Sequence, residues 1–386
     1  MGTATTILLL TALAGAAQDS DVPVAEPTTQ DLFTSGVAGY HTYRIPALVT
    51  TASGALLAFC EGRRTGSADS GDIDLLLRRS TDRGRTWSDV QVLWDDGTNV
   101  CGNPCPVVDR ESGAITLLMT WSDGDVPESD IAVGHGTDSK RVFLSRSTDD
   151  GLTWSEPADI TPSVKPVEWS WYVAGPGAGI QMERGEHAGR LVVPCDHKTP
   201  GPEGTRFESH VILSDDGGLT WRAGGSAPRD AVNECEVAEL EDGSLLLNMR
   251  NYDRSVRARQ TCTSRDGGES WGDQRHDEAL VEPVCQASLR RLRWRAGDAP
   301  GVLLFSNPAS TEARHRLTVR ASYDDCRTWA HSRLLYEGSS AYSCLTALDD
   351  GTIGCFFEAD DYGRLVFARF GLDWVQAEAE ASRRDQ

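Results

Sequence analysis

One eight-residue pattern recurs five times along this chain and constrains its fold more than any other feature. The copies share the form Ser-x-Asp-x-Gly-x-Thr/Ser-Trp, and their first residues are separated by 67, 67, 50 and 58 positions. They are STDRGRTW (80–87), STDDGLTW (147–154), SDDGGLTW (214–221), SRDGGESW (264–271) and SYDDCRTW (322–329), the last with Cys326 in place of the glycine. A strand-like run precedes each copy. Repeats at this spacing predict a series of similar β-sheet units.

The chemistry of the repeat explains why it should form a turn. Its Ser and Asp side chains can accept hydrogen bonds from backbone N–H groups, and its glycine adopts a conformation that a β-carbon disfavours. The Trp then starts the return strand. The pattern predicts an all-β fold, a six-bladed β-propeller of four-stranded antiparallel sheets. Five copies fit six blades if one blade lacks the pattern and is closed by joining the two ends of the chain.

Composition excludes several classes of protein. The chain has 386 residues, of which 39% are hydrophobic, so there is enough apolar material for a sizeable core. Its formal net charge of −21 and sequence pI near 4.7 argue against nucleic-acid binding and against a basic membrane-binding surface. Beyond the N-terminus, no stretch approaches the roughly 20 apolar residues that cross a bilayer. We expect a protein with no nucleic-acid partner and no membrane span in its mature form.

The N-terminus has the pattern of a secretory signal peptide. An apolar stretch from Ile7 to Leu13 is followed by small residues from Ala14 to Ala17. The alternatives are an N-terminal membrane anchor or a disordered start, because the segment carries no Lys or Arg. We expect a secreted or periplasmic protein.

The domain organisation follows from these two features. The predicted divisions are a signal peptide at 1–17, a linker at 18–30, the propeller at 31–373 and a helical surface tail at 374–386.

The ten cysteines are too sparse for a disulfide scaffold in a chain of this length. Cys101 and Cys105, in CGNPC, are close enough to suggest a bridge or a metal clip. No nearby His or Cys pair completes a zinc site, so we expect no metal.

The stretch YHTYRIPALV at 40–49 contains two residues that do not fit a simple strand. Arg44 stands at the start of an apolar run and Pro46 lies within it. Proline cannot donate a hydrogen bond to a sheet, and a charge removed from water needs a partner. The segment is therefore either a frayed edge strand with a solvated arginine, or a strand that presents its arginine to an anion.

Together with the repeats, YRIP at 43–46 resembles the exo-α-sialidase family, and the resemblance covers nearly the whole chain after the N-terminus. It implies that Arg44 is one of three arginines that bind the substrate carboxylate. Guanidinium groups suit this task because they bind carboxylates bidentately and stay charged.

The resemblance also identifies the other two arginines. Arg250 follows Glu234 by sixteen residues, as in the family, and Arg314 lies just ahead of the fifth repeat. Arg316 is the alternative to Arg314, because it is two residues away and would share its strand face.

The catalytic residues implied by the resemblance are Asp69, Glu234 and Tyr342. Asp69, in the Gly/Ser/Asp-rich segment 61–75, matches the family's acid/base, with Asp72 and Asp74 as alternatives. A mobile loop suits a general acid whose pKa rises when substrate excludes water.

Tyr342, in SAYSCLTALDDGTIGCFFE (340–358), matches the nucleophile, and Glu234 matches the base that takes its proton. A neutral phenol avoids the repulsion that a carboxylate nucleophile would meet beside the substrate carboxylate.

Further contacts are implied less directly. Glu61 and Arg63 resemble residues that contact the 4-hydroxyl region of the sugar. Trp121 is a candidate wall for the N-acetyl group, and Asp196 and His197 are candidates for the aglycone side.

The function implied is that of a retaining exo-α-sialidase. It would hydrolyse terminal α-linked sialic acid from glycans, glycoproteins or glycolipids through a tyrosyl-enzyme intermediate, as a monomer and without a cofactor. Two alternatives remain. One is a non-catalytic glycan-binding propeller, which would need the arginines but not the three catalytic residues. The other is a glycosidase or transglycosidase that acts on a related nonulosonic acid.

Overall fold

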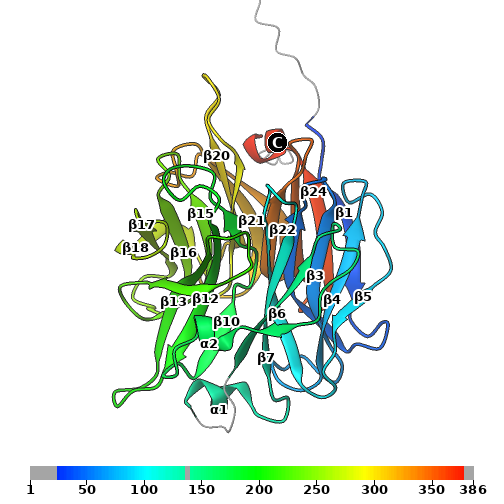
Figure 1. Cartoon of the computed structure of the whole chain (residues 1–386). Helices are drawn as coiled ribbons and strands as arrows, with labels where there is room; N and C mark the ends of the chain where they lie inside the picture. Colours follow the sequence, from blue (N-terminus) through cyan, green and yellow to red (C-terminus); the bar gives the residue numbers. More distant parts are fainter. Residues whose placement is uncertain (1–23, 135–139, 378–386) are drawn as a thin grey trace, which may run out of the picture.

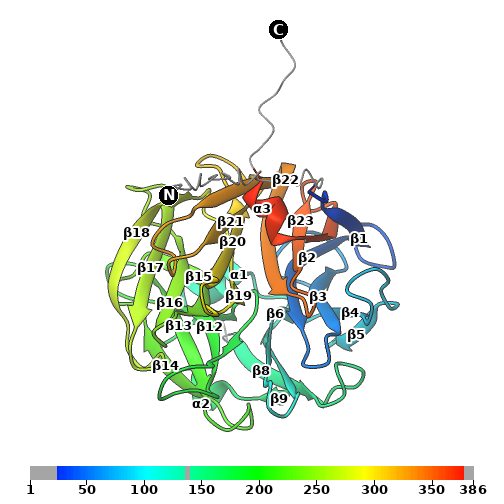
Figure 2. The same cartoon turned by 90° about the horizontal axis from the view of Figure 1, so that it is seen from above.

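The regular secondary structure of the described residues is mostly β-strand, as Figures 1 and 2 show. The computed structural model describes residues 24–134 and 140–377, so the predicted signal peptide at 1–17 lies outside the described residues. Three short helices accompany the strands: α1 (Glu128–Ala132), α2 (Thr161–Val164) and α3 (Leu372–Gln376). Within the described residues, no helix is long and apolar enough to cross a membrane.

The strands form antiparallel sheets that stand around a common axis when viewed from above (Figure 2). The first sheet has eight strands and consists of two four-stranded units joined by one parallel pairing, between Ile73 and Val100. Its strands are β2 (Thr42–Thr50), β3 (Leu56–Arg63), β4 (Ile73–Ser80), β5 (Gln91–Trp94), β6 (Val100–Val108), β7 (Ile115–Ser122), β8 (Arg141–Ser147) and β9 (Ala158–Asp159).

Two smaller sheets follow along the chain. The five-stranded sheet contains β10 (Trp171–Ala174), β11 (Ile180–Gln181), β12 (Leu191–Thr199), β13 (Arg206–Ser214) and β14 (Arg222–Ser226). The four-stranded sheet contains β15 (Val232–Glu239), β16 (Leu245–Asn251), β17 (Ala258–Ser264) and β18 (Gly272–Val281).

The last sheet brings the two ends of the chain together. Its seven strands are β19 (Ser288–Arg293), β20 (Val302–Pro308), β21 (His315–Ser322), β22 (His331–Ala347), β23 (Ile353–Ala359), β24 (Arg364–Phe370) and β1 (Thr28–Thr34). The long β22 pairs with β21 through its first half and with β23 through its second half. β1 pairs antiparallel with β24, so the first described strand is an edge of the sheet built from the last strands.

Both predicted boundaries of the repeat region differ from the structure. β1 begins at Thr28, within the segment expected to be a linker at 18–30. At the other end, α3 packs against the last sheet and buries Trp374 and Val375, so these two residues are not part of a surface tail. Both residues are apolar, and burying them against Phe370 and its neighbours removes that surface from water.

Each repeat forms the turn that its residues predict, between the third and fourth strands of a four-stranded unit. In the first copy, Ser80 accepts from the N–H of Gly84 at 2.9 Å, and Asp82 accepts from the N–H of Thr86 at 2.8 Å and from its hydroxyl at 2.7 Å. The fifth copy keeps the same bonds although Cys326 replaces the glycine and adopts a positive φ of 62°. The side-chain bonds therefore hold the turn even without the glycine.

The repeat glycines also allow neighbouring sheets to pack closely. A β-carbon on Gly84 would lie 2.3 Å from the ring of Phe367, which belongs to β24, and one on Gly151 would lie 2.8 Å from Leu57 in β3. The tryptophans of the repeats pack at the same places. The ring of Trp154, for example, lies edge-on against that of Phe59, with 5.8 Å between the ring centroids. The repeats thus stabilise turns and join sheets, which is a structural role.

Four of the strands nearest the axis carry a β-bulge at one common level. The register shifts between Arg44 and Ala47 in β2, and equivalent shifts occur in β6, β15 and β22. Ile45 has a φ of +60°, which is rare for a β-branched residue. Pro46 lies in this unpaired bulge, where its missing N–H costs no sheet hydrogen bond. Bulges turn side chains out of the regular alternation, and these turn them toward the axis.

The cysteines are free thiols, so the bridge suggested for Cys101 and Cys105 does not form. Both are fully buried in β6, where they pack as small apolar side chains.

Candidate active site

A cavity of about 580 Å³ opens at one end of the axis, at the level of the bulges. All eight predicted site residues line it. They are Arg44, Glu61, Arg63, Asp69, Glu234, Arg250, Arg314 and Tyr342. They come from three of the four sheets, so the cavity exists only because the sheets meet around one axis.

Arg44 lies in the cavity wall and has a buried partner that the sequence prediction does not include. Its Nε donates to Glu358 at 2.8 Å, and its Nη2 donates to the same carboxylate at 3.4 Å. Glu358, in β23, also accepts from the N–H groups of Ile45 and Tyr342, each at 3.0 Å. One carboxylate therefore holds the arginine, the bulge of β2 and the backbone of Tyr342 together. Arg44 keeps Nη1 directed to the cavity, 3.7 Å from Asp69.

Arg250 and Arg314 line the same cavity, and Arg316 does not. Arg250 donates from Nη1 to Glu234 at 2.6 Å and to the Tyr342 hydroxyl at 3.1 Å. Arg314 donates to the Tyr362 hydroxyl at 3.2 Å, and its guanidinium lies 5.6 Å from the centre of the Tyr342 ring. Arg316 is instead exposed and paired with Glu337. Arg316 was an alternative to Arg314 because side chains two residues apart in a regular strand share a face. The positive φ of 63° at Arg316 breaks that regular alternation.

Tyr342 and Glu234 form a direct hydrogen bond at the floor of the cavity. The phenol donates to Glu234 Oε1, while Oε2 accepts from Arg250. Both residues lie inside bulges, in β22 and β15 respectively. Burial, followed by the charge of Glu234, raises the pKa of Tyr342 well above its ordinary value, although Arg250, Arg314 and Arg44 oppose this shift. The phenol is therefore protonated in the free protein, with an acceptor in place for its proton.

Asp69 lies at the cavity mouth in an ion pair. Its carboxylate is 2.7 Å from Arg63 Nη2, and its side chain is 55% exposed. Desolvation would raise its pKa, but the charges of Arg63 and Arg44 outweigh it and hold the pKa of Asp69 below its ordinary value. The expected general acid is thus a carboxylate in the free protein.

Arg63 and Glu61 organise this side of the cavity. Arg63 donates from Nε and Nη2 to Glu61, and from Nη1 to the carbonyls of Ser67 and Ala68 at 2.6 and 3.0 Å. The loop that carries Asp69 is therefore fixed by its own arginine.

The alternatives to Asp69 lie elsewhere. Asp72 pairs with Arg64 at 3.3 Å, and the buried Asp74 accepts from Tyr40 and Arg64, each at 2.6 Å. Neither lines the cavity.

Three further expectations are not met by the geometry. Trp121 does not line the cavity, and its indole N–H donates to Asp96 at 2.7 Å in an exposed contact. His197 is buried behind the wall and contacts His210 at 3.1 Å between the two Nδ1 atoms. Asp196 is also buried, where it accepts from Asn233, and burial followed by the charge of Glu234 raises its pKa well above the ordinary value. None of the three lines the cavity.

Several residues of the site are absent from the sequence prediction. Glu358 had a usable signal, since it is a charged residue directly after the apolar run 353–357, just as Arg44 is a charged residue at the start of an apolar run. Tyr362 stacks on the Arg44 guanidinium at 4.2 Å, but a tyrosine in a polar turn carries no such signal. The cavity wall also contains Lys140, Trp171 and Lys198.

The described residues 24–134 and 140–377 contain no cluster of three or more His, Cys, Asp or Glu side chains that could hold a metal ion.

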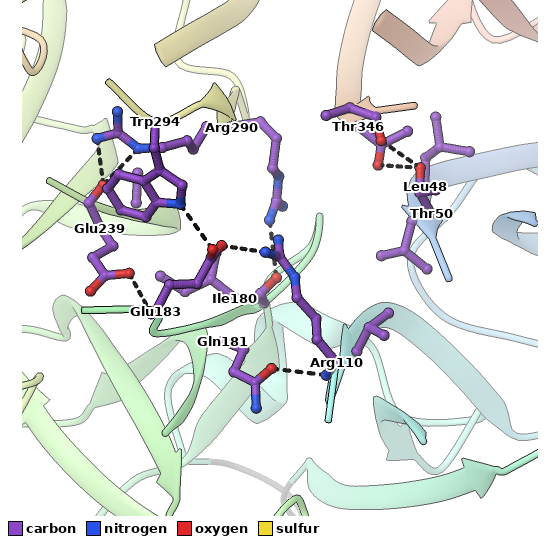
Figure 3. A pocket seen from close by; sticks show the side chains of 16 residues that line it. Leu48, Thr50, Arg110, Ile180, Gln181, Glu183, Glu239, Arg290, Trp294 and Thr346 are labelled. Carbon is purple, nitrogen blue, oxygen red and sulfur yellow. Dashed lines mark hydrogen bonds and ion pairs between the residues drawn. The ribbon is translucent and has the colours of Figure 1, made fainter. Parts of the chain in front are cut away.

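A second cavity of about 120 Å³ is lined by different residues (Figure 3). Its charged groups are mutually engaged: Arg110 and the indole N–H of Trp294 both donate to Glu183, and Arg290 donates to two backbone carbonyls. None of the eight predicted site residues lines this second cavity.

Comparisons with known proteins agree with this arrangement. Residues 54–355 match the family described as BNR repeat-like domain. The chain is 31% identical to the exo-alpha-sialidase of Aspergillus fumigatus over 91% of this chain and 89% of that protein. The chain belongs to the sialidase family.

The chain spans only part of two other relatives, about half of the first. It is 40% identical to the sialidase of Micromonospora viridifaciens over 92% of this chain but 55% of that protein. The Hadza microbial sialidase Hz136 matches with a TM-score of 0.81 and 34% identity, over 90% of this chain and 69% of that one. The intramolecular trans-sialidase from Ruminococcus gnavus, at 20% identity and a TM-score of 0.77, shares the fold over 90% of this chain and 98% of that one.

Proposed function

We propose that this chain is a retaining exo-α-sialidase that removes terminal sialic acid from glycoconjugates. The observation that carries the proposal is the Tyr342–Glu234 hydrogen bond at the floor of a cavity lined by three arginines. A carbohydrate-binding protein needs cations for the carboxylate, but it has no use for a buried phenol paired with a base.

The reaction begins with the substrate carboxylate bound by Arg44, Arg250 and Arg314. The phenol oxygen of Tyr342 attacks the anomeric carbon as its proton passes to Glu234, and Asp69 protonates the leaving glycosidic oxygen. The tyrosyl–sugar bond forms as the glycosidic bond breaks. Asp69 then removes a proton from water, which attacks the anomeric carbon, and Tyr342 leaves and recovers its proton from Glu234. Two displacements retain the configuration.

Substrate binding also prepares Asp69 to act as an acid. In the free protein the guanidinium charges of Arg63 and Arg44 stabilise the carboxylate form of Asp69. A sialic acid carboxylate bound to Arg44 replaces part of that stabilisation, and the sugar excludes water from Asp69. Both changes raise its pKa toward the value that proton transfer requires.

We also propose that the fold is a six-bladed β-propeller. The four-stranded units, with β1 completing the unit of β22–β24, are the blades of a six-bladed propeller, and five of them carry the repeat. Export through residues 1–17 and action as a monomer remain our predictions.

The test is release of free sialic acid by the purified chain from α2,3-linked and α2,6-linked sialyllactose. We expect Tyr342→Phe to lower kcat by about 10³-fold while an inhibitor carboxylate still binds, because the arginines are unchanged. Analysis of the product separates hydrolysis from transfer to another sugar. Binding of sialylated glycans without release by the unmodified chain would instead favour the non-catalytic alternative.

A further inference from the structure

A second group of charged side chains lines the cavity, built from different elements than the three arginines. We name it the lysine wall, and it consists of Glu128, Lys140, Trp171 and Lys198. The Trp171 ring holds both ammonium groups, with Lys198 Nζ at 4.1 Å and Lys140 Nζ at 5.1 Å from its centre. The indole N–H donates to Glu128 at 2.5 Å, which fixes the ring in place.

The wall has more positive than negative charge. Its only carboxylate, Glu128, lies 3.6 Å from Lys140 Nζ. Within the described part of the chain, Lys198 Nζ has contacts with the rings of Trp171 and Phe207, at 4.1 and 4.9 Å, and none with a carboxylate. Asp196, two residues earlier in β12, is fully buried and does not line the cavity; burial, followed by the charge of Glu234, raises its pKa, and the charge of Lys198 opposes this shift. Lys198 is therefore a half-buried amino group that lines the cavity and directly contacts no carboxylate of the described residues; burial lowers its pKa, and the charges of Glu128 and Asp196 oppose that shift.

The position of the wall relates it to the leaving group. Lys140 is close enough to Asp69 to lower its pKa, and Asp69 is the residue that protonates the leaving oxygen under the proposed function. The three arginines already account for the carboxylate of the sialic acid being released. Lys198 contacts the same Trp171 ring as Lys140, so a further amino group on this side of the cavity is available to a second anion, on the other side of the bond that breaks.

We propose that Lys198, supported by Lys140 and Trp171, is a subsite for an anionic group on the leaving sugar. This inference rests on the proposed function. The chemistry fits a carboxylate, as on a second sialic acid, or a sulfate ester, since an ammonium is a point charge that accepts either. The enzyme would then prefer sialic acid attached to an anionic sugar over sialic acid attached to a neutral one.

The experiment compares kcat/KM on three substrates: α2,3-sialyllactose, the lactose derivative with a terminal α2,8-linked second sialic acid, and α2,3-sialyl-lactosamine carrying a 6-sulfate. We expect Lys198→Gln to lower kcat/KM about tenfold on one or both anionic substrates, equivalent to about 1.4 kcal/mol, and less than twofold on sialyllactose. Lys198→Arg, which keeps the charge, should retain most of the preference. Arg206→Gln is the matched control, since Arg206 is 57% exposed on the paired strand β13 and does not line the cavity.

The outcomes separate the two proposals. A loss only on the disialylated substrate identifies the carboxylate, and a loss only on the sulfated one identifies the sulfate. Equal losses by Lys198→Gln on all three substrates, or no loss on either anionic one, would overturn the subsite while leaving the sialidase intact. Failure of the unmodified chain to cleave any of the three would overturn the proposed function and the subsite with it.

Discussion

Replacing Glu358 by Gln tests whether one buried carboxylate organises the active site. The side chain is fully buried and accepts four hydrogen bonds, two from Arg44 and one each from the N–H groups of Ile45 and Tyr342. Glutamine has the same shape, but one of its two terminal atoms is an NH₂ donor. In either orientation this NH₂ faces two donors, and the charge that balances Arg44 is gone.

The expected cost follows from these contacts. Removing one partner of a buried ion pair costs about 3–5 kcal/mol, because the remaining charge stays buried. Arg44 retains Asp69 at 3.7 Å, and the amide oxygen still accepts two bonds, so the lower end applies. We expect the free energy of unfolding to fall by about 3 kcal/mol. With a urea m-value of about 3 kcal/mol per molar, the unfolding midpoint should fall by about 1 M.

Urea unfolding followed by tryptophan fluorescence measures this change, and the KM for sialyllactose measures the effect on Arg44. KM should rise, because the guanidinium that binds the carboxylate loses its support. Glu337→Gln is the control, since Glu337 is 66% exposed on β22 and pairs with the exposed Arg316. An exposed pair contributes less than about 1 kcal/mol.

A change of less than about 0.5 kcal/mol for Glu358→Gln, with an unaltered KM, would refute the reasoning. It would mean that the carboxylate is neither charged nor required where the structure places it. A double variant that also carries Arg44→Met should recover part of the lost stability, because it removes the unpaired charge.

Two further predictions concern binding and pH. Arg314→Ala should raise KM by about tenfold or more, whereas Arg316→Ala should leave KM within twofold; equal effects would contradict the placement of Arg314 in the cavity. Burial, followed by the charge of His197, holds the pKa of His210 well below its usual 6.5, so the unfolded chain binds a proton more readily. The stability from a neutral His210 is present above pH 6.5 and is lost at up to about 1.4 kcal/mol per unit as pH falls. His210→Phe should therefore reduce the loss of unfolding free energy between pH 6.5 and 5, measured against the unmodified chain; an unchanged slope would count against it.

Much of the fold can be predicted from the sequence because the repeat is a local structure. The hydrogen bonds that shape its turn close within five residues, so Ser80, Asp82 and Thr86 form the turn wherever the chain places it. The sialidase family can be identified from the same repeats with the YRIP segment, and the eight predicted site residues do line one cavity.

The sequence indicated which charged residues need partners but did not identify those partners. The apolar residues around Arg44 show that its charge needs a partner. That partner is Glu358, 314 positions away, and it is reached only when the two ends of the chain meet in neighbouring sheets. In the same way, strand alternation could not separate Arg314 from Arg316, because the backbone of Arg316 leaves the alternation.

The sequence by itself therefore determined the turns, the all-β class and the types of residue that the chemistry requires. Tertiary structure decided which of those residues line the cavity and which partners they have there. It buried Asp196 and His197 behind the wall, placed Trp121 outside, paired Asp69 with Arg63, and brought two lysines onto one tryptophan. The physical reason is that hydrogen bonds in a turn depend on neighbours in the chain, whereas the environment of a charge depends on all the sheets that surround it.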